Sequence, residues 1–342
     1  MLRKTSIIIA SALLYALAAG VCAATVDDYL RRDVVPLGVT TGAGGIELGD
    51  LMQDAAAETI RAEIVAPLQQ PLTLAAAGQN YTLDSSRYVE VDVEKMVRAA
   101  IAPSRSSALS VRVWRRLTET PVNLDIPVEK RVAESEVGVW INDTAKQIAI
   151  PAVDASRTVE RTGVTITPEK QGRSVDTSSA AKLLREALLD GTRSVQAPIR
   201  TIKPKVTSED FGRVIIVRLD KRKLYLYEGE KLLHTYGVAI GTSAHPTPTG
   251  EWKIVNKVFM PSWHNPGTAW AKSMPKSIPS GPSNPLGTRA LYLNASGIRI
   301  HGTTNNGSIG TAASHGCMRM HRWDIEALYP EVPVETPVYI MR

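Results

Sequence analysis

Short apolar runs separated by turns fill the chain from residue 213 onward, and this pattern restricts the fold more than any other. Three consecutive runs, with turns at DKRK and EGEK, are RVIIVRL, KLYLYEG and KLLHTYGVAIG. Further runs are GEWKIVNKVFM, RALYLN, GIRIHG and TPVYIMR, and only HRWDIEALY has a helical pattern there. Closely spaced short strands with regular turns predict a mostly β, sandwich-like or barrel-like domain over residues 212–342.

The preceding part of the chain, residues 34–205, mixes helical and extended patterns, which predicts a separate α+β module. Apolar spacing of three and four residues predicts helices over residues 50–65, 92–102 and 175–191. Strands are predicted over residues 71–84 and 107–117. Residues 199–212 contain a proline and several charges but no apolar face, and are predicted to link the two domains.

The first residues, MLRKTSIIIASALLYALAAGVCAA, have the charged, apolar and small-residue regions of a secretory signal. The apolar run from Ile7 to about Ala19 is shorter than the ~20 residues of a spanning helix. This length favours a signal peptide over residues 1–23, cleaved after Ala23, and no stable membrane span. A lipoprotein signal at Cys22 is the alternative, although Val21 is branched where lipidation needs a small residue. We therefore expect an exported, periplasmic or wall-associated protein of the cell envelope.

Cysteine is rare in this chain. Of its 2 cysteines, Cys22 lies in the predicted signal and Cys317 lies in ASHGCMRM. After cleavage one thiol remains, so neither an internal disulfide framework nor a zinc site of several cysteines can form. The fold must depend on an apolar core, for which 44% hydrophobic and 22% charged residues are an ordinary globular composition.

Basic residues are concentrated in the C-terminal domain. From Phe211 to Arg342 there are 15 Lys and Arg against 8 Asp and Glu, hence +7. The remainder has 40 − 15 = 25 and 34 − 8 = 26, hence −1. Such an excess of positive charge is able to steer binding to an anionic polymer, for example cell wall, a lipid surface or nucleic acid. The alternative is that these charges only form a solvated surface.

One connection, Pro261–Gly287, is much longer than the others and contains Trp263 and Trp270. Loops beyond ~12–15 residues are usually functional or disordered, and the tryptophans argue against disorder. We predict a flap over a functional site. A long surface loop held in place by its tryptophans is the alternative reading.

Three roles are open to Cys317: nucleophile, metal ligand or buried residue. A nucleophile needs a base, and His301 at the end of GIRIHG or His315, two residues before the thiol, is able to supply one. Gly316 leaves backbone N–H groups accessible for an oxyanion. Arg319 adds a positive charge that lowers the thiol pKa or holds a substrate carboxylate.

The competing roles fit the residues less well. Zinc could be held by His301, His315, Cys317 and His321, but His-x-Cys is not a usual structural-zinc spacing and no carboxylate is present as a base. An isolated cysteine is most often buried. The surrounding histidines and glycines favour the nucleophile.

These residues resemble the signature of the L,D-transpeptidases, the YkuD-like family. The likeness rests on IRIHGT, ASHGCMRM, TPTGEW and NPLGTRALYL, and it covers roughly residues 212–342. Residues 34–205 resemble, less specifically, the peptidoglycan-binding-like module that often precedes such domains. LGVTTGAGGIELGDL and QGRSVDTSSAAKLLREAL carry that second likeness.

The resemblance implies a β-rich catalytic domain that remodels peptidoglycan. Cys317 is then the nucleophile and His301 its base, with the Gly302 carbonyl orienting the imidazole. His315 and Gly316 line the oxyanion pocket. Expected at the substrate are Arg319, Ser314, Gly302 and Trp263, although Gly302 lacks the hydroxyl that some relatives have.

The implied reaction begins with thiolate attack on a stem tetrapeptide at the carbonyl that joins its third residue to terminal D-alanine. D-Alanine leaves, a thioester forms, and a second stem's amine resolves it into a 3→3 cross-link. The implied partners are peptidoglycan stem peptides, with carbapenem β-lactams as inhibitors; no cofactor, metal or nucleic acid is implied. A carboxypeptidase or endopeptidase that hydrolyses the same acyl-enzyme, and an idle wall-binding protein, remain alternatives.

Overall fold

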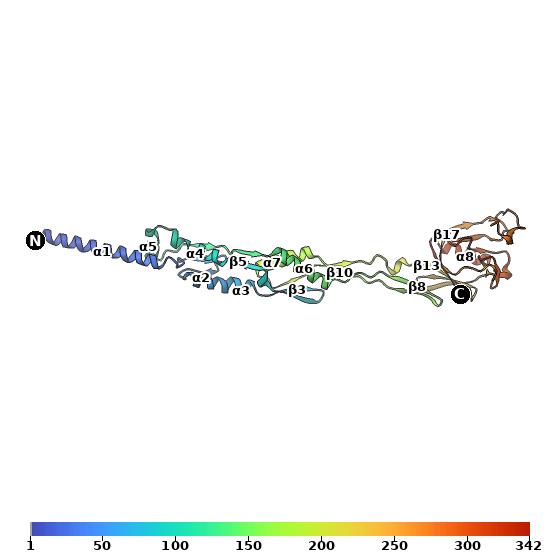
Figure 1. Ribbon diagram of the computed structural model, residues 1–342, viewed down its shortest axis with the longest axis horizontal. Coiled ribbons are helices and arrows are strands. Elements are labelled where there is room, and N and C mark those ends of the chain that lie inside the picture. Colours follow the sequence, from blue (N-terminus) through green and yellow to red (C-terminus); the bar gives the residue numbers. More distant parts are fainter. Residues whose placement is uncertain (1) are drawn as a thin grey trace. The chain divides into compact units, whose positions relative to one another are not determined.

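The computed structural model describes residues 2–342, with side chains described from Ile9 onward, and its chain divides into two compact units (Figure 1). Unit 1 comprises the chain up to Ile150 and Arg173–Thr201, and unit 2 comprises Pro151–Gly172 and Ile202–Arg342. The sequence assigned residues 151–172 to the N-terminal module. In the structure they belong to the C-terminal unit.

Unit 1 begins with α1 (Leu2–Leu30), the blue helix at the N-terminus in Figure 1. Its window Ile9–Leu30 has a mean hydropathy of 2.0, so by length and composition this helix is able to cross a membrane. An N-terminal signal sequence has the same properties. The apolar segment is longer than the run ending at Ala19, because no charge occurs between Lys4 and Asp27.

The other helices of unit 1 are α2 (Gln53–Ile60), α3 (Ala66–Leu68), α4 (Val93–Ser106), α5 (Leu109–Thr118), α6 (Glu134–Ile148) and α7 (Thr177–Asp190). Its strands are β1 (Val39–Thr41), β2 (Ile46–Glu47), β3 (Leu72–Ala76), β4 (Gln79–Leu83), β5 (Val89–Val91), β6 (Leu124–Ile126), β7 (Lys130–Val132) and β11 (Ser194–Gln196). Two strands at the unit boundary are β10 (Gly172–Val175) and β12 (Ile199–Ile202). The predicted α+β class is confirmed.

The core of unit 1 is formed where α2, α4, α6 and α7 meet the small sheets. Ile60, Met96, Ile141 and Leu188 are each at most 1% exposed. Every one of them lies on the apolar face of its helix, as the three- and four-residue spacing requires.

The segment 107–117, predicted as a strand, is the helix α5 instead. Its apolar and charged residues alternate only locally; over the whole segment Leu109, Val113 and Leu117 recur every four residues. That spacing places them on one side of a helix, and Arg112 and Arg116 on another. The prediction was wrong because the alternation in VRVW covers only four residues.

Unit 2 is built on an eight-stranded sheet with the order β15-β14-β13-β24-β17-β20-β21-β23. These strands are β13 (Arg213–Arg218), β14 (Lys223–Glu228), β15 (Lys231–Gly237), β17 (Gly250–Phe259), β20 (Arg289–Leu293), β21 (Arg299–Gly302), β23 (Met318–Met320) and β24 (Pro337–Met341). β13 pairs with β24, and β21 with β23, in parallel; the other neighbours are antiparallel.

The two ends of this sheet meet. Just after the edge strand β15, Ala239 exchanges two backbone hydrogen bonds of 2.9 Å with Arg319 of the opposite edge strand β23. The sheet therefore closes on itself nearly as a barrel, around a core that includes Ile215, Leu226 and Ile300, each fully buried. The predicted mostly β fold of this domain is confirmed.

Shorter elements complete unit 2: β8 (Ser156–Glu160), β9 (Gly163–Thr167), β16 (Ile240–Gly241), β18 (Trp263–His264), β19 (Ser277–Ile278), β22 (Ala312–Ser314) and α8 (Arg322–Glu331). The hairpin β8–β9 packs on the sheet face away from the main core. There Val164 joins Val214 and Ile216, which are 8%, 0% and 2% exposed. The Arg218 guanidinium also donates a hydrogen bond to the carbonyl of Arg161 in the hairpin turn.

Candidate active site

The parallel pair β21–β23 brings the two main predicted residues together. His301 of β21 is in register with Arg319 of β23, and Ile300 with Met318. Residues in register point to the same side of a sheet, and residues two apart on one strand do as well. Cys317, directly before β23, therefore shares a face with Arg319 and His301, while Ile300 and Met318 are fully buried on the other face.

His301 is held in one orientation. Its side chain is 5% exposed, and its Nδ1 lies 2.6 Å from the carbonyl oxygen of Gly302. A carbonyl oxygen can only accept, so Nδ1 carries the proton and Nε2 is left with a free lone pair. Burial lowers the pKa of His301 to about 3. The imidazole is thus neutral at neutral pH and able to accept a proton.

The glycine after His301 is required by close packing. A Cβ on Gly302 would lie 3.1 Å from Cγ2 of Ile325 in α8 and 3.4 Å from Cα of Gly287. Gly287, with φ +70°, has even less room, since its own Cβ would approach the Gly302 backbone to 2.9 Å. This glycine–glycine contact fixes the carbonyl that orients His301, so the missing side chain at Gly302 has a steric reason.

Cys317 is half-buried, and its thiol donates a hydrogen bond of 3.4 Å to the carbonyl of Gly297. Burial raises the pKa of this thiol, while the nearby guanidinium groups of Arg299 and Arg319 act in the opposite direction. The resting pair is therefore a neutral thiol beside a neutral imidazole. Arg299 lies one alternation before His301 on β21, which places it on the same face.

The loop before Cys317 is fixed by side-chain hydrogen bonds. Ser314 Oγ donates to the Cys317 carbonyl at 2.6 Å and accepts from the Gly316 N–H at 3.2 Å. Thr247 Oγ1 donates to the Gly316 carbonyl at 2.8 Å and accepts from the Gly241 N–H at 2.9 Å. Ser314 thus acts here as a brace for the loop, and one predicted oxyanion donor, the Gly316 N–H, is engaged within it.

His315 faces outward and connects this loop to the long connection Pro261–Gly287. Its ring stacks on Trp270, with centroids 4.1 Å apart and an interplanar angle of 15°, and lies 4.9 Å from the ring of His245. Partial burial, and secondarily the charges of His245 and Arg319, lower the pKa of His315. The predicted flap therefore contacts, through Trp270, the loop that precedes Cys317.

Trp263, predicted beside the substrate, lies in the flap's own small core. It is 5% exposed and packs with Ala271, Leu286 and Trp270. The side chain that reaches the site is Trp270, seven residues further along the chain.

The fourth residue of the zinc alternative, His321, points elsewhere. Its Nδ1 lies 3.1 Å from Oδ1 of Asn306, and its ring stacks on Trp323 at 4.5 Å. Among the side chains that the structure describes, no group of three or more His, Cys, Asp or Glu is arranged to hold a metal ion.

Four residues around the site were not singled out from the sequence as contributing to it: Arg299, Thr247, His245 and Trp270. Arg299 could have been found, because a strand over GIRIHG already puts it on the face of His301. Thr247 and His245 act across the fold, on the loop that contains Cys317. Nothing in their local sequence indicates this.

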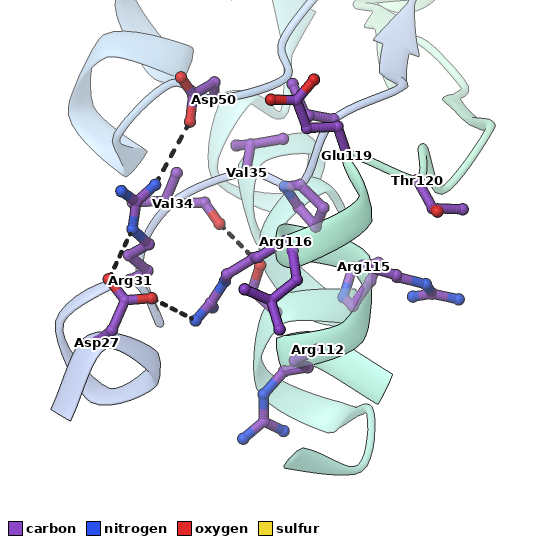
Figure 2. Close-up of a pocket in the computed structure, with 15 residues that line it drawn as sticks. Asp27, Arg31, Val34, Val35, Asp50, Arg112, Arg115, Arg116, Glu119 and Thr120 are labelled. Atoms are coloured by element: carbon purple, nitrogen blue, oxygen red, sulfur yellow. Dashed lines mark hydrogen bonds and ion pairs between the residues drawn. The ribbon is translucent and has the colours of Figure 1, made fainter. Parts of the chain in front are cut away.

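A cavity of about 460 Å³ opens in unit 1 (Figure 2). It is lined by Arg31, Arg112, Arg115 and Arg116 together with Asp27, Asp50 and Glu119. None of the predicted site residues contributes to it. Its chemistry is therefore separate from that of Cys317.

Comparison with known proteins gives consistent matches. The model of the L,D-transpeptidase catalytic domain, YkuD, matches residues 212–340, and that of a putative peptidoglycan binding domain matches residues 81–196. The chain is 39% identical over 126 residues to the putative L,D-transpeptidase YkuD of Bacillus licheniformis, covering 37% of this chain and 64% of that protein. It is 33% identical over 132 residues to the putative L,D-transpeptidase YqjB of Bacillus subtilis, covering 37% and 69%.

A third relative, the probable L,D-transpeptidase YbiS of Escherichia coli strain K12, is 32% identical over 157 residues, covering 43% of this chain and 49% of its own. The chain thus spans about half to two thirds of the curated relatives it matches. A structure of Mycobacterium tuberculosis L,D-transpeptidase 3 with a faropenem-derived adduct is 12% identical, covers 59% of this chain and 85% of its own, and has a TM-score of 0.34. Because this TM-score is low, the structural match supports no argument here. The comparison rests on the sequence matches.

Proposed function

This chain belongs to the L,D-transpeptidase family, and from that premise we propose that it cross-links peptidoglycan stem peptides through a thioester on Cys317. The observation that supports this most is the register of β21 and β23. It sets a buried, neutral imidazole on the same face as the thiol, together with Arg319. A base, a nucleophile and a positive charge on one face are what acyl transfer requires.

The acylation step needs one proton transfer in each direction. His301 Nε2 takes the thiol proton as the sulfur attacks the carbonyl carbon between the third stem residue and D-alanine. Backbone N–H groups of the loop around Gly316, other than that of Gly316 itself, which donates to Ser314 Oγ, stabilise the oxyanion. When the C–N bond breaks, the imidazolium returns the proton to the leaving amine, and free D-alanine and a thioester result.

In the second half the side-chain amine of another stem attacks the thioester. His301 accepts the amine proton, an amide forms, and the sulfur leaves and takes the proton back. The product is a 3→3 cross-link. If water reaches the thioester instead, the protein is a carboxypeptidase or endopeptidase. The flap contact of Trp270 with His315 supports cross-linking, because it covers the nucleophile loop from one side.

The substrate roles of the remaining residues are part of this proposal. Arg319, half-buried beside the thiol, is suited to hold a stem carboxylate. Trp270, whose ring stacks on His315, takes the place beside the substrate where Trp263 had been expected. The N-terminal module, which matches a putative peptidoglycan binding domain, would hold the protein on its polymer substrate.

Export and inhibition complete the proposal. α1 would direct the chain out of the cytoplasm as a signal peptide, which brings the catalytic domain to the cell envelope where its substrate lies. A carbapenem would acylate Cys317 because its strained carbonyl presents the same electrophile as the stem peptide.

Intact-mass spectrometry tests the reaction directly. We would incubate the protein with a diaminopimelate-containing tetrapeptide stem, beside Cys317→Ala. The expected result is a tripeptide-sized adduct on the native protein alone, which converts to cross-linked dimer when acceptor stem is added. Adduct that resolves only to free tripeptide would identify a hydrolase. No adduct with either the stem or a carbapenem would leave a wall-binding protein with an unreactive cysteine.

A further inference from the structure

The helix α5 (Leu109–Thr118) exposes an apolar face that none of the described side chains of its unit covers. None of its residues is buried: Trp114 is 65% and Leu117 78% exposed, and Leu109 is 41% exposed. Leu109, Val113 and Leu117 follow one another at four-residue spacing, and Trp114 lies beside them. A helix with one apolar and one charged side, and no core contact for the apolar side, is typical of helices that lie on a membrane.

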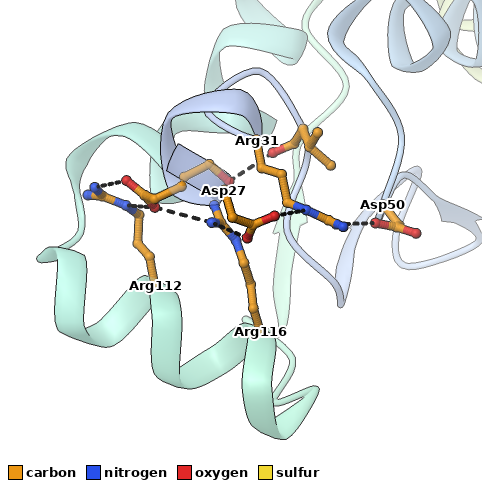
Figure 3. Close-up of polar contacts among 8 residues, drawn as sticks. Asp27, Arg31, Asp50, Arg112 and Arg116 are labelled. Atoms are coloured by element: carbon orange, nitrogen blue, oxygen red, sulfur yellow. Dashed lines mark hydrogen bonds and ion pairs between the residues drawn. The ribbon is translucent and has the colours of Figure 1, made fainter. Parts of the chain in front are cut away.

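Ion pairs, rather than apolar contacts, attach α5 to the end of α1. Asp28 accepts hydrogen bonds of 2.9 and 2.6 Å from the guanidinium of Arg112, and these side chains are only 3% and 10% exposed. Arg116 lies 3.3 Å from Asp28 and 3.5 Å from Asp27 (Figure 3). The charged side of α5 thus pairs with the end of α1, and the apolar side of α5 faces away from α1.

The length of α1 determines where this attachment would lie relative to a bilayer. Between Lys4 and Asp27 there are 26 − 4 = 22 consecutive uncharged residues. At about 1.5 Å per residue they span roughly 33 Å, close to the ~30 Å of a bilayer's hydrocarbon core. When α1 is in a membrane, Asp27 and Asp28 therefore lie at its outer boundary, and α5 lies with them.

Aromatic and basic side chains lie near the same membrane boundary as Asp27 and Asp28. Tyr29 at the end of α1 is 71% exposed, and with Trp114 it provides the aromatic residues that prefer the membrane–water boundary. Arg115 is the one lining arginine of the cavity with no carboxylate within 4.0 Å among the described side chains, and it points away from Asp27 in Figure 2. It is available to a phosphate.

We propose that α5 is a membrane-surface helix whose occupant is the headgroup region of a bilayer containing anionic phospholipid. Trp114 and Leu117 insert at the acyl boundary, and Arg115 binds lipid phosphate. Asp27 and Asp28 follow Ala23 in the chain, so their ion pairs with α5 remain in a chain cleaved there, in which α5 alone would bind the membrane. The module that matches a peptidoglycan-binding domain is then held with one end on the membrane. This inference does not depend on the reaction at Cys317.

Tryptophan quenching tests the position of α5. The full chain is reconstituted into vesicles of phosphatidylcholine and phosphatidylglycerol whose acyl chains are brominated near the glycerol end. We expect brominated lipid to quench part of the tryptophan fluorescence, and Trp114→Phe to remove most of that quenched part. Trp323→Phe is the matched control, because Trp323 is similarly exposed (59%) but is not part of α5; it should leave the part quenched through α5 unchanged.

A second variant separates insertion from mere proximity. In the same vesicles, Leu117→Asp with Arg115→Gln should raise backbone hydrogen exchange in residues 109–118 at least several-fold, with unchanged exchange in α4. Equal quenching in the native chain and in Trp114→Phe overturns the proposal. So does protection of α5 in detergent without lipid that depends on protein concentration, which would identify a second copy of the chain as the occupant.

Discussion

At the scale of single residues, the site differs from cysteine enzymes that rest as a thiolate–imidazolium pair. His301 is buried and neutral, and Cys317 is a thiol whose pKa burial raises. In the reaction proposed above, nucleophile and base therefore become charged only as the proton moves during attack. The Cys317–His301 pair itself carries no charge at rest, so substrate binding, which excludes water, does not have to desolvate a thiolate–imidazolium ion pair.

The first prediction concerns the pH profile. The pKa of His301 is lowered to about 3, so its basic form is complete above that value and is lost only as pH falls through it. The thiol stays protonated below its raised pKa. The rate constant for acylation by a carbapenem, followed by stopped flow, should be flat from about pH 5 to 8. A bell centred near pH 6.5 would contradict the neutral pair.

The second prediction concerns Arg299, which helps to hold the thiol pKa down. In Arg299→Met this effect is lost, so the thiolate fraction at neutral pH falls. Alkylation of Cys317 by iodoacetamide should slow about three- to tenfold, with its pH dependence moved upward. Arg289→Met is the control, because Arg289 lies over Phe259 at 4.0 Å and should leave alkylation unchanged. An unmoved pH dependence in Arg299→Met would show that Arg299 does not contribute to the thiol pKa.

At the scale of elements, the two tryptophans of the flap have separate tasks. Trp263 is part of the flap's core, and Trp270 stacks on His315. In Trp270→Ala we expect acylation by carbapenem to slow about tenfold, because the half-buried ring that stacks on His315 is lost, while the buried Trp263, Ala271 and Leu286 keep the flap core and the melting temperature nearly unchanged. Trp263→Ala should instead make the flap sensitive to limited proteolysis. Equal rates in Trp270→Ala and the native protein would show that the flap does not assist acylation.

The sequence predicted the strands of the C-terminal domain well, but it did not predict which strands pair with one another. The strand over GIRIHG and the residues His301 and Cys317 follow from alternation and from the motif. That β21 lies parallel to β23 depends on how the connection between them folds, which no local pattern encodes. The same limit applies to Thr247, whose hydroxyl holds the Gly316 carbonyl from 69 residues away.

The error at residues 107–117 has a different physical cause. Helix and strand periods differ little over four residues, and α5 has no buried face to reveal which period holds. A segment that packs against the core shows its period through buried residues. In α5, which we propose to pack against lipid, no buried residues reveal the helical period. Only the spacing of its arginines does so.

At the scale of the whole molecule, the hairpin β8–β9 is part of the catalytic unit. Val164 is 8% exposed against Val214 and Ile216, so Val164→Asp buries a carboxylate in that cluster. We expect it to destabilise unit 2 by about 2–4 kcal/mol. The measurement is the temperature at which half of the carbapenem acylation is lost. Thr165→Asp, on the exposed side of the same strand, should leave that temperature within a degree or two.

The interleaving of the two units has a consequence for inheritance. The chain passes between them three times, after Ile150, Gly172 and Thr201. A single genetic crossover cannot transfer the complete catalytic unit without also moving Arg173–Thr201 of unit 1, because that segment lies between the hairpin and the strands of the barrel. Fusion partners joined at residue 212 would leave the outer face of the sheet uncovered. The two halves of this protein are therefore expected to change partners rarely and to diversify together, as one inherited piece.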